Sequence, residues 1–270
     1  MLSVIIPYYN KYELTSACVD SFIKYNPDLD YEIILIDNNS DLQTVEKINS
    51  TYGKIKNIHL VSFPYPFNFQ KINNWGVRIS HGEILYFLNN DTEFVEESVG
   101  LMDKMIAKCK ESDIGAVGSL MVYEDHETIQ HAGVYLRPEP NADHIFMGRK
   151  MSDLIADSSI EKEYDFRTDR QVTGVTAAGL MVEKKKFLEV EGFQEKFIVC
   201  SGDIDLCINL FLAGYKTWYI GSHFILHKES QSRKGSLIPI SDFTEGYKSY
   251  SRIYDDEKGD LFTPIKYTSI

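Results

Sequence analysis

The stretch Ile84–Glu93 reads ILYFLNNDTE and decides the fold class of the chain around it. Its first half, Ile84–Leu88, is a short apolar run that predicts a buried strand. Small or acidic polar residues follow that strand directly, from Asn89 to Glu93. Because the same residue types also form turns and helix N-caps, the stretch by itself leaves both a simple turn and a ligand site open.

Length, charge and cysteine content narrow the class of protein. The chain has 270 residues, enough for one large α/β domain, and 43% of them are hydrophobic, which supplies a sizeable core. Its net charge is −12, so we expect no nucleic-acid partner, because such a partner needs a basic face. The four cysteines form no CxxC pair, and we expect them to be reduced. They are Cys18, Cys109, Cys200 and Cys207.

The sequence shows no pattern of a secreted or membrane-spanning protein. The N-terminus runs straight into a strand-like segment, without the basic and apolar regions of a signal peptide. No apolar run approaches the ~20 residues that cross a bilayer. We therefore expect a cytoplasmic protein without a transmembrane segment, and peripheral contact with the inner face of the membrane stays open.

Strands and helices alternate along the first third of the chain, which predicts a mostly parallel sheet with helices on both faces. Buried strands are predicted at Ser3–Pro7, Glu32–Ile36, Ile58–Ser62 and Ile84–Leu88. Helices are predicted at residues 13–25, 41–52 and 70–80. Polar residues follow the first, second and fourth strands. Since parallel strands all end at one edge, these polar loops converge where ligands of open α/β sheets bind.

The later part of the chain predicts further strands and helices and one long irregular segment. Strands are predicted at residues 114–123, 172–183, 216–220 and 223–226, and a short strand or hairpin at residues 128–136. Helices are predicted at residues 96–110, 184–190, 203–213 and 245–254. Residues 137–169 are polar and irregular, which predicts an excursion over the ligand-binding edge of the sheet.

Three common nucleotide or hydrolase motifs are absent from the sequence. No GxGxxG follows the first strand, there is no GxxxxGK[ST] loop, and there is no GxSxG elbow. The sequence therefore argues against a dinucleotide-dependent dehydrogenase, a P-loop enzyme and the usual α/β-hydrolase. What remains is a site built from carboxylates and amides at strand ends, where a carboxylate holds a divalent cation and the cation holds phosphate oxygens.

Five separated motifs stand in the order seen in family 2 glycosyltransferases with the GT-A fold, which this chain resembles from residue 3 to about 230. They are SVIIP with Tyr9-Asn10, IDNNS at 36–40, FLNNDTE at 87–93, GDIDLC at 202–207, and His227. Two further stretches, QHAGV at 130–134 and VTAAG at 175–179, resemble the branch that contains bacterial rhamnosyl- and other polysaccharide-building transferases.

The resemblance implies a fold and an activity. The expected fold is α/β of the GT-A type, with a mostly parallel central sheet flanked by helices. It implies one glycosyltransferase domain over residues 1–240, with a donor half at 1–95 and an acceptor half at 96–240, and a helical tail at 241–270. The implied enzyme is an inverting, metal-dependent glycosyltransferase of the hexosyltransferase type. It would move a sugar from a UDP- or dTDP-activated donor to a saccharide or glycoconjugate acceptor, and a homo-oligomer stays open.

The resemblance also assigns the donor site. Asp37 would accept a hydrogen bond from the pyrimidine base, whose imide N–H suits a carboxylate; the alternative is an Asx turn that caps the next helix. Pro7, Tyr9 and Asn10 would shape the nucleotide pocket, with Lys11 near the phosphates. The full set of substrate-binding residues implied is Pro7, Tyr9, Asn10, Lys11, Asp37, Lys71, Asn74, Asn89, Asn90, Ala178 and Gly179.

In the resemblance, Asn89-Asn90-Asp91 takes the place of the family's DxD motif. Asp91 is then the carboxylate that binds Mn²⁺ or Mg²⁺, together with oxygens of the donor diphosphate. Asn89 replaces the first aspartate; it can still hydrogen-bond ribose or a metal-bound water but brings no charge. His227 matches a further metal ligand of some relatives, and the alternative is a structural histidine.

Asp203 is the expected catalytic base. The family usually has Glu-Asp here, and Gly202 replaces the glutamate. Inverting transfer needs a carboxylate that takes the proton from the acceptor hydroxyl as it attacks the anomeric carbon. The alternative is that Asp203 and Asp205 only favour the positive end of their helix; we expect Asp203 to be catalytic and Asp205 structural.

Two rival functions can be weighed against this one. A catalytically silent, nucleotide-sugar-binding module of the same fold is disfavoured, because Asp37, Asp91 and Asp203 are all intact. A sugar-nucleotide nucleotidyltransferase would carry a glycine-rich, basic loop after the first strand, and Tyr8–Glu13, which reads YYNKYE, is not such a loop.

Overall fold

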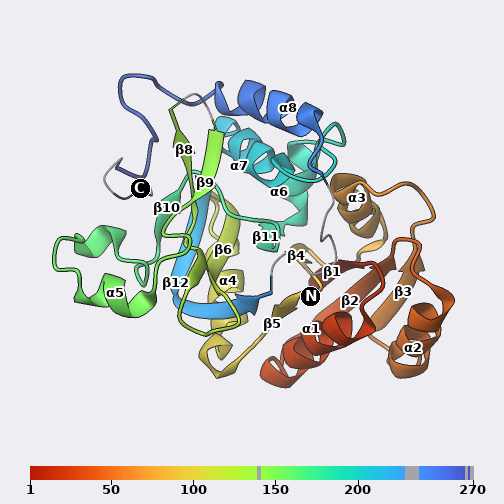
Figure 1. The fold of residues 1–270 in the computed structure, drawn as a ribbon. Helices are drawn as coiled ribbons and strands as arrows, with labels where there is room; N and C mark the ends of the chain where they lie inside the picture. The colour runs from red at the N-terminus through yellow and green to blue at the C-terminus, as the bar shows by residue number, and fades with distance from the viewer. Residues whose placement is uncertain (139–140, 229–236, 265–266, 268–270) are drawn as a thin grey trace.

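The computed structural model describes residues 1–138, 141–228, 237–264 and 267. One large sheet runs through the middle of this part of the chain, and helices cover both of its faces (Figure 1). A second, two-stranded sheet lies beside it. The candidate site depends on how the strands of the large sheet are ordered.

The first half of the sheet is built from four parallel strands. They are β1 (Leu2–Tyr8), β2 (Tyr31–Asp37), β3 (Ile58–Ser62) and β4 (Ile84–Leu88). β1 lies at the centre and pairs with both β2 and β4, and β3 pairs with β2. All of these strands were predicted from their apolar runs, and their carboxyl ends lie at one edge of the sheet.

The second half is joined to the first by one reversed strand, β11 (Gly179–Glu183). It runs antiparallel between β4 and β6 (Ile114–Val122). Beyond β6 follow β12 (Lys216–His227), parallel to β6, and β10 (Arg170–Val172), antiparallel to β12. Two short strands, β5 (Thr92–Glu93) and β7 (Ile129–His131), pair with β12 and β6. The strand order β10-β12-β6-β11-β4-β1-β2-β3 confirms a mostly parallel central sheet.

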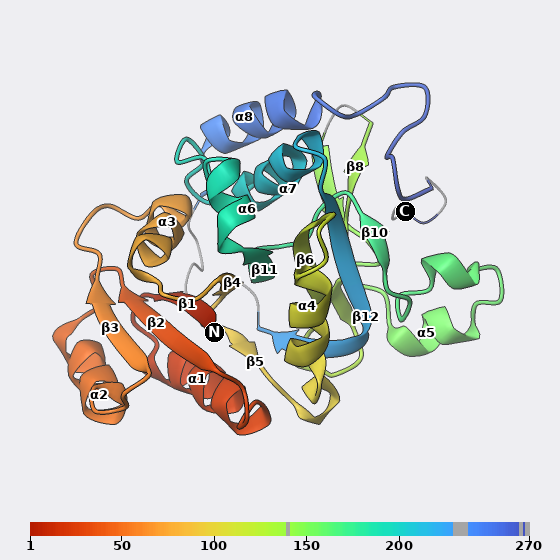
Figure 2. The ribbon, with the colours of Figure 1, turned by 180° about the vertical axis from the view of Figure 1, so that it is seen from behind.

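Two layers of helices enclose the sheet. The helices on one face are α1 (Tyr12–Tyr25), α2 (Leu42–Tyr52) and α4 (Leu101–Cys109), and those on the other are α3 (Phe69–Ile79), α6 (Lys184–Glu189) and α7 (Gly202–Leu212). Figure 2 shows α4 below the sheet in this view, on the same face as α1 and α2. α8 (Ile240–Tyr250) packs on α7, on the side of α7 that faces away from the sheet.

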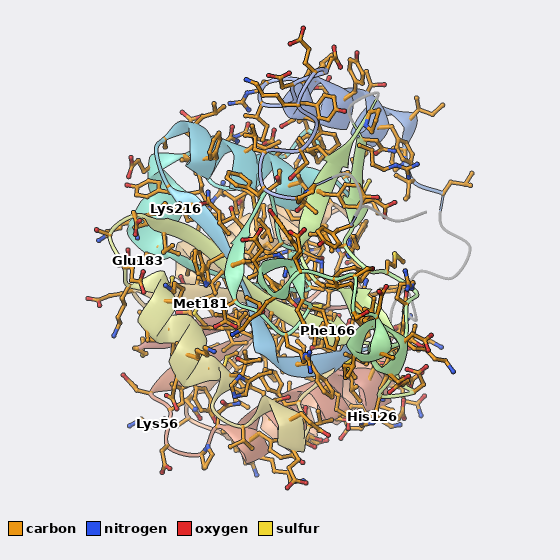
Figure 3. The ribbon with its side chains drawn as sticks, turned by 90° about the vertical axis from the view of Figure 1, so that its left-hand side faces the viewer. Lys56, His126, Phe166, Met181, Glu183 and Lys216 are labelled. Carbon is orange, nitrogen blue, oxygen red and sulfur yellow. The ribbon has the colours of Figure 1, made fainter. Side chains whose placement is uncertain are left out.

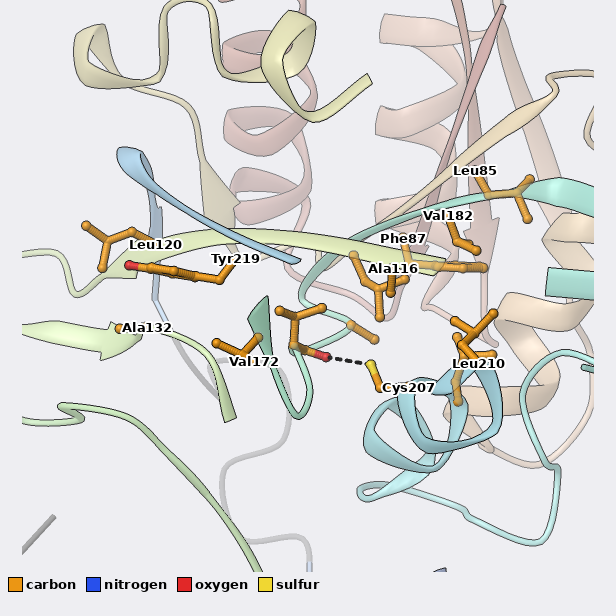
Figure 4. Close-up of a cluster of buried hydrophobic side chains, with 14 of the residues drawn as sticks. Leu85, Phe87, Ala116, Leu120, Ala132, Val172, Val182, Cys207, Leu210 and Tyr219 are labelled. Atoms are coloured by element: carbon orange, nitrogen blue, oxygen red, sulfur yellow. Dashed lines mark hydrogen bonds between the residues drawn. The ribbon is translucent and has the colours of Figure 1, made fainter. Parts of the chain in front are cut away.

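The core is two-sided because residues of the central strands alternate between the layers. Leu85 and Phe87 of β4 belong to the cluster under α3, α6 and α7, whereas Tyr86 and Leu88 belong to the cluster under α1, α2 and α4. Figure 4 shows the first cluster, in which Cys207 of α7 packs toward the sheet. In Figure 3, Met181 of β11 lies inside the packed side chains, while Lys56 and His126 lie at the outside.

Several predicted elements are divided in the structure. The strand predicted at 172–183 is β10 and β11, separated by the loop 173–178. In this loop Gly174 O accepts a hydrogen bond from Val134 N at 2.8 Å, and Ala178 O accepts one from Asn89 N at 3.0 Å. The segment predicted at 128–136 as a short strand or hairpin is divided at Gly133, with φ 98°, into β7 and β8 (Val134–Arg137), which belong to different sheets. The helix predicted at 96–110 breaks at Gly100, with φ 84°, into the 3₁₀ turn η1 (Glu96–Ser98) and α4.

Other predictions differ in extent. The strands predicted at 216–220 and 223–226 form the single strand β12, with an irregularity between Ile220 and Phe224. The excursion 137–169 is more ordered than predicted: it holds β9 (Asn141–His144), which pairs with β8, together with α5 (Met151–Ala156) and η2 (Lys162–Tyr164). The tail helix α8 begins at Ile240, earlier than its sequence pattern indicated.

The four cysteines form no disulfide bond. All four are free thiols, and only Cys200 is not fully buried. Within the described residues, no helix has the length and apolar character needed to span a bilayer.

A buried carboxylate, Glu32, ties together the edge of the sheet opposite the polar loops. Only 3% of Glu32 is exposed, and its Oε1 accepts hydrogen bonds from Ser3 Oγ at 2.6 Å and His81 N at 2.5 Å. Its Oε2 lies 3.0 Å from His81 Nδ1 and 3.2 Å from His59 Nε2. Burial raises the pKa of Glu32, but the hydrogen bonds from Ser3 and His81 outweigh it and leave that pKa below its ordinary value.

This network predicts an acid-dependent loss of stability. A lowered folded-state pKa stabilises the protein above the unfolded pKa of about 4.3, and the effect disappears as the pH falls through the folded-state pKa. Glu32→Gln should therefore lower the free energy of unfolding at pH 7 by about 1–3 kcal/mol. The deficit relative to the native chain should shrink in acid. Urea unfolding at several pH values measures it, with the exposed Glu46→Gln as control; a deficit that does not change with pH would contradict the assignment.

Candidate active site

The loops after β1 and β2 are joined to each other at the carboxyl edge of the sheet. Asn10 N donates to Ser40 Oγ at 2.7 Å, and Asp41 N donates to Asn10 Oδ1 at 2.8 Å. Asn10, Lys11 and Asn39 have positive φ values of 50°, 55° and 61°, which are uncommon for residues other than glycine. The neighbouring loop contacts hold this backbone in place, as is typical of functional sites.

Asp37 ends β2 at this edge and is half-buried. Its Oδ1 accepts a hydrogen bond from Ser40 N at 3.0 Å, so the Asx turn considered from the sequence is present. Tyr8 lies opposite Asp37 in the strand register. Burial, and then the charge of Asp37, raise the pKa of Tyr8, which keeps its hydroxyl protonated. Asn38 points away from this pair and donates to Phe63 O and Tyr65 O.

The other predicted nucleotide-pocket residues lie on the same edge. Tyr9 and Lys11 are exposed, and Pro7 is partly buried within β1. The 48% exposure of Tyr9 leaves an aromatic face free of core packing. The structure therefore brings Pro7, Tyr9, Asn10 and Lys11 together with Asp37.

A short antiparallel pairing brings Asp91 and His227 together, although 135 intervening residues separate them in the chain. β5 pairs with the end of β12 so that Thr92 faces His227 in the register, and Lys228 N donates to Asp91 O at 2.9 Å. His227 Nε2 lies 3.3 Å from Asp91 Oδ1. Both side chains are buried, with exposures of 4% for Asp91 and 6% for His227.

The arrangement of His227 fits a metal ligand. Its Nδ1 lies 3.3 Å from Gln130 Oε1, so the tautomer that carries its proton on Nδ1 can donate to that oxygen and leave the lone pair of Nε2 directed toward Asp91. That buried Nε2 has no hydrogen-bond partner in the described part of the chain, although it lies 3.3 Å from Asp91 Oδ1. A carboxylate beside an imidazole lone pair suits Mn²⁺ or Mg²⁺, and Gln130 fixes the ring as outer partners of metal-bound histidines do.

The chain supplies only a partial coordination shell. Among residues 1–138, 141–228, 237–264 and 267, no group of three or more His, Cys, Asp or Glu side chains could hold a metal. A cation held by Asp91 and His227 would therefore have most of its positions filled by water and substrate oxygens. This is typical of cations that act on phosphate groups.

The turn that carries Asp91 is held on both sides. Asn89 N donates to Ala178 O at 3.0 Å, and Asn89 O accepts from Thr92 N at 3.2 Å and Thr92 Oγ1 at 2.8 Å. Asn90 is buried, and its Nδ2 donates to Thr15 Oγ1 of α1 at 2.9 Å. Asn90 therefore anchors the turn to α1, and Thr92 closes it. Burial raises the pKa of the nearby Cys18 thiol to about 12, which excludes a thiolate nucleophile there.

Asp203 lies in the first turn of α7, after Ser201 with φ 68°. Its Oδ2 accepts a hydrogen bond from Ala177 N at 3.0 Å, and its Oδ1 accepts one from Ile204 N at 3.0 Å. The neighbouring Ala178 carries the carbonyl that binds Asn89 N. The loop 173–178 thus touches both the turn of Asp91 and the carboxylate of Asp203. Ala178 and Gly179 lie where the two meet.

Asp205 has structural partners, as expected. Only 2% of it is exposed; its Oδ1 accepts from Ser249 Oγ at 2.5 Å, and its Oδ2 accepts from Asn209 Nδ2 at 3.0 Å. Arg252 Nη1 lies 3.9 Å from the same carboxylate. Asp205 therefore fastens α7 to α8.

The structure places Lys71 and Asn74 on a side of α3 that faces the segment 193–195. Asn74 Nδ2 donates to Phe193 O at 2.8 Å, and Asn74 Oδ1 accepts from Phe193 N at 3.2 Å. Lys71 Nζ lies 4.0 Å from Glu195 Oε2. Both residues therefore have partners within the protein and are not gathered with Asp91 and Asp203 by any contact in the described chain.

The inward face of α3 instead presents Gln70 and Asn73, which the sequence analysis did not select. Both are buried, and neither Gln70 Oε1 nor Asn73 Oδ1 has a hydrogen-bond partner among the described residues. Their spacing to Ile72 and Val77 matches the buried stripe of this helix, so helical periodicity was the available signal.

Asp242 is a second residue that the sequence analysis did not identify. It is fully buried in the first turn of α8. Its carboxylate accepts hydrogen bonds from the backbone N–H groups of Ile198, Val199 and Cys200 at 3.0, 2.7 and 3.0 Å. These residues directly precede α7, so Asp242 positions the segment that leads into Asp203.

Removing the charge of Asp242 should loosen this segment. Hydrogen bonds to a charged group contribute about 1.5–3 kcal/mol, so Asp242→Asn should lower the free energy of unfolding by about 1–3 kcal/mol. Chemical denaturation measures the change, and the exposed tail variant Asp256→Asn should stay within about 0.5 kcal/mol of the native chain. An Asp242→Asn variant as stable as Asp256→Asn would contradict the anchoring role.

Sequence comparison places these features in a known family. The model of Glycosyl transferase family 2 matches residues 3–168. The O-antigen biosynthesis protein RfbC of Myxococcus xanthus is 30% identical over 261 residues, which are 97% of this chain and 20% of that protein. A poly(ribitol-phosphate) beta-glucosyltransferase of Bacillus spizizenii is 27% identical over 122 residues, 42% of this chain and 18% of that protein. The chain spans about a fifth of the length of these relatives.

Solved structures of glycosyltransferases share the fold at low sequence identity. GalNAc-T7, solved with UDP, GalNAc and Mn²⁺, has a TM-score of 0.64 and 14% identity, covering 84% of this chain and 43% of its own. S. aureus TarS 1-349 with UDP-GlcNAc has a TM-score of 0.60 and 14% identity over 91% and 64% of the two chains. Mannosyltransferase PcManGT of Pyrobaculum calidifontis, with GDP-Man and Mn²⁺, has a TM-score of 0.58 and 13% identity over 92% and 68%.

The family match covers more than half of the chain and includes residues 3–8 of β1, the strands β2 to β4, the turn of Asp91 and the Asp37 edge. The structural matches show the same arrangement of helices and sheet. This chain therefore belongs to the family 2 glycosyltransferases and has the GT-A fold.

Proposed function

We propose that this chain is an inverting, metal-dependent glycosyltransferase that moves a sugar from a UDP- or dTDP-activated donor to a saccharide or glycoconjugate acceptor. One observation carries the proposal. The loop 173–178 contacts the turn of Asp91 through Ala178 and the carboxylate of Asp203 through Ala177, at the edge where β2 ends in Asp37. A metal-ligand pair and a candidate base are thus held by one loop.

The donor nucleotide fits the Asp37 side of this edge. A carboxylate accepts the imide N–H of uracil or thymine, and these bases share that edge. Tyr9 and Lys11 lie exposed beside it, where a base and phosphates can reach them. Two of the structural neighbours were solved with UDP or UDP-GlcNAc, which supports a uridine donor, whereas a third was solved with GDP-Man.

Asp91 and His227 are the residues that would hold Mn²⁺ or Mg²⁺. When bound there, the cation neutralises the negative charge that develops on the leaving diphosphate. Asn89, at the start of the same turn, contributes a neutral amide toward ribose or a metal-bound water. Mn²⁺ in the crystals of two structural neighbours supports this part of the proposal.

Asp203 acts as the base. Its carboxylate is oriented by the N–H groups of Ala177 and Ile204. It takes the proton of the acceptor hydroxyl while that oxygen bonds to the anomeric carbon, and the bond to the diphosphate breaks on the opposite face. The configuration at the anomeric carbon therefore inverts.

Wider roles rest on the same proposal. The name of the Myxococcus xanthus relative supports a place in polysaccharide assembly. We assign the donor half to residues 1–95 and the acceptor half to residues 96–240, with a tail at 241–270. We place the protein in the cytoplasm, with peripheral membrane contact and self-association as further expectations.

The metal assignment predicts that Asp91→Ala abolishes metal-dependent donor binding. Thermal shift with UDP-GlcNAc, UDP-glucose and dTDP-sugars, each with and without Mn²⁺, measures this, because a ligand of the folded state raises the melting temperature. The native chain should show a larger shift with Mn²⁺, and so should the exposed loop variant Asp28→Ala. An Asp91→Ala variant with an undiminished Mn²⁺-dependent shift would remove Asp91 from the metal site.

The base assignment predicts that Asp203→Asn keeps donor binding and loses turnover by about 10²–10⁴-fold. The amide can still accept the Ala177 N–H, so the local structure should persist. Asp205→Asn, two residues further on, is the matched control: it should lower thermal stability but retain turnover. Near-native turnover of Asp203→Asn would refute the base, whereas donor binding by the native chain without any turnover would support the silent binding module.

A further inference from the structure

Gln70 is a buried polar side chain whose amide oxygen is unused. It lies in the first turn of α3 and is 1% exposed. Its Oε1 has no hydrogen-bond partner within the described residues. A buried, unpaired amide oxygen lowers stability, so a side chain of this kind at an enzyme site calls for a functional reason.

The amide of Gln70 is packed against the N-terminus of α7. A Cβ added to Gly202 would lie 2.4 Å from Gln70 Cδ and Nε2 and 2.7 Å from Oε1, closer than atoms can approach. A side chain at position 202 would therefore displace the Gln70 amide from this place. Because Gly202 has no side chain, the Gln70 amide contacts Gly202 itself, the residue directly before Asp203.

The start of α7 adds a helix N-terminus to this corner. Its N-cap, Ser201, makes no side-chain capping bond, and Asp203 lies in its first turn. The positive end of an eleven-residue helix and a free amide oxygen thus lie next to the candidate base. Donor and acceptor groups close together suit a hydroxyl group, which can both donate and accept.

We propose that Gln70 Oε1 accepts a hydrogen bond from a hydroxyl group of the acceptor saccharide, beside the hydroxyl that Asp203 deprotonates. This inference rests on the proposed function. The acceptor is favoured over the donor sugar because Gln70 contacts the helix of Asp203, whereas the donor-side residues Asp37 and Asp91 belong to other loops. Gln70 is then a specificity-determining residue for the acceptor.

Asn74, one helical turn along α3, shows what a purely structural amide looks like here. Its oxygen and nitrogen are both bonded to the backbone of Phe193. Gln70 has no such bond at its oxygen. Asn74 therefore has a structural role in α3, whereas the oxygen of Gln70 has none within the described chain.

The test is Gln70→Met, which keeps the length of the side chain and removes its amide group. Removing an unpaired buried oxygen should leave the melting temperature unchanged or raised. The substrates are UDP-GlcNAc as donor and a panel of p-nitrophenyl glycosides of glucose, galactose, N-acetylglucosamine and rhamnose as acceptors. We expect the acceptor KM and the calorimetric Kd of the best glycoside to rise about three- to tenfold, the loss of one neutral hydrogen bond.

Hydrolysis of the donor tests whether Gln70 contacts the acceptor or the donor sugar. In that reaction water replaces the saccharide, so Gln70→Met should hydrolyse UDP-GlcNAc at the native rate and with the native donor KM. Gln43→Met, at an exposed position of α2, is the matched control and should change neither reaction. A rise in donor KM with an unchanged acceptor KM would overturn the acceptor assignment, and unchanged binding and kinetics would overturn the inference altogether.

A second variant tests the contact with Gly202. Gly202→Ala should displace the Gln70 amide and raise the acceptor KM as Gln70→Met does. In a Gln70→Ala background the added methyl group has space, so the two substitutions should be strongly non-additive. Additive effects would contradict the contact. Glycoside binding weakened by Gln70→Met in a chain that never transfers sugar would keep this inference and reject the proposed function.

Discussion

Two hydrogen bonds from the loop 173–178 hold the candidate active site together. Ala178 O accepts the N–H of Asn89, and Ala177 N donates to the carboxylate of Asp203. The loop occupies this place because β11, which follows it, runs antiparallel between β4 and β6 and so begins at the edge where β4 ends. One reversed strand in a parallel sheet thus brings elements from both halves of the chain to a single edge.

The same edge is surrounded by contacts that restrict movement. The loops after β1 and β2 bind each other through Asn10 and Ser40, and the segment before α7 is held by Asp242 of α8. Phe69 N, at the start of α3, donates to Ile198 O of that segment at 2.8 Å. The tail helix is therefore a support for the site. Left-handed residues and an unpaired amide are tolerated there because the surrounding structure holds them.

The local parts of this arrangement were readable from the sequence, and the long-range parts were not. Apolar runs predicted the strands β1 to β4, and the polar residues after them predicted the edge with Asp37 and Asp91. The division of residues 172–183 into β10 and β11 was missed, because small and apolar residues fill the loop as they fill strands. The pairing of β5 with β12, which sets His227 beside Asp91, has no local signal; the resemblance to the family supplied His227 instead. Gln70 and Asp242 were missed because each acts on a segment far away in the chain.

The central claim is that sugar is transferred by direct displacement at the anomeric carbon, with Asp203 as the base. The most direct measurement is the anomeric configuration of the product, followed by NMR with the UDP- or dTDP-sugar that binds in the presence of Mn²⁺. The account predicts that every α-linked donor yields a β-linked product, both in transfer and in the first product of hydrolysis. A product that retains the configuration of the donor would contradict it.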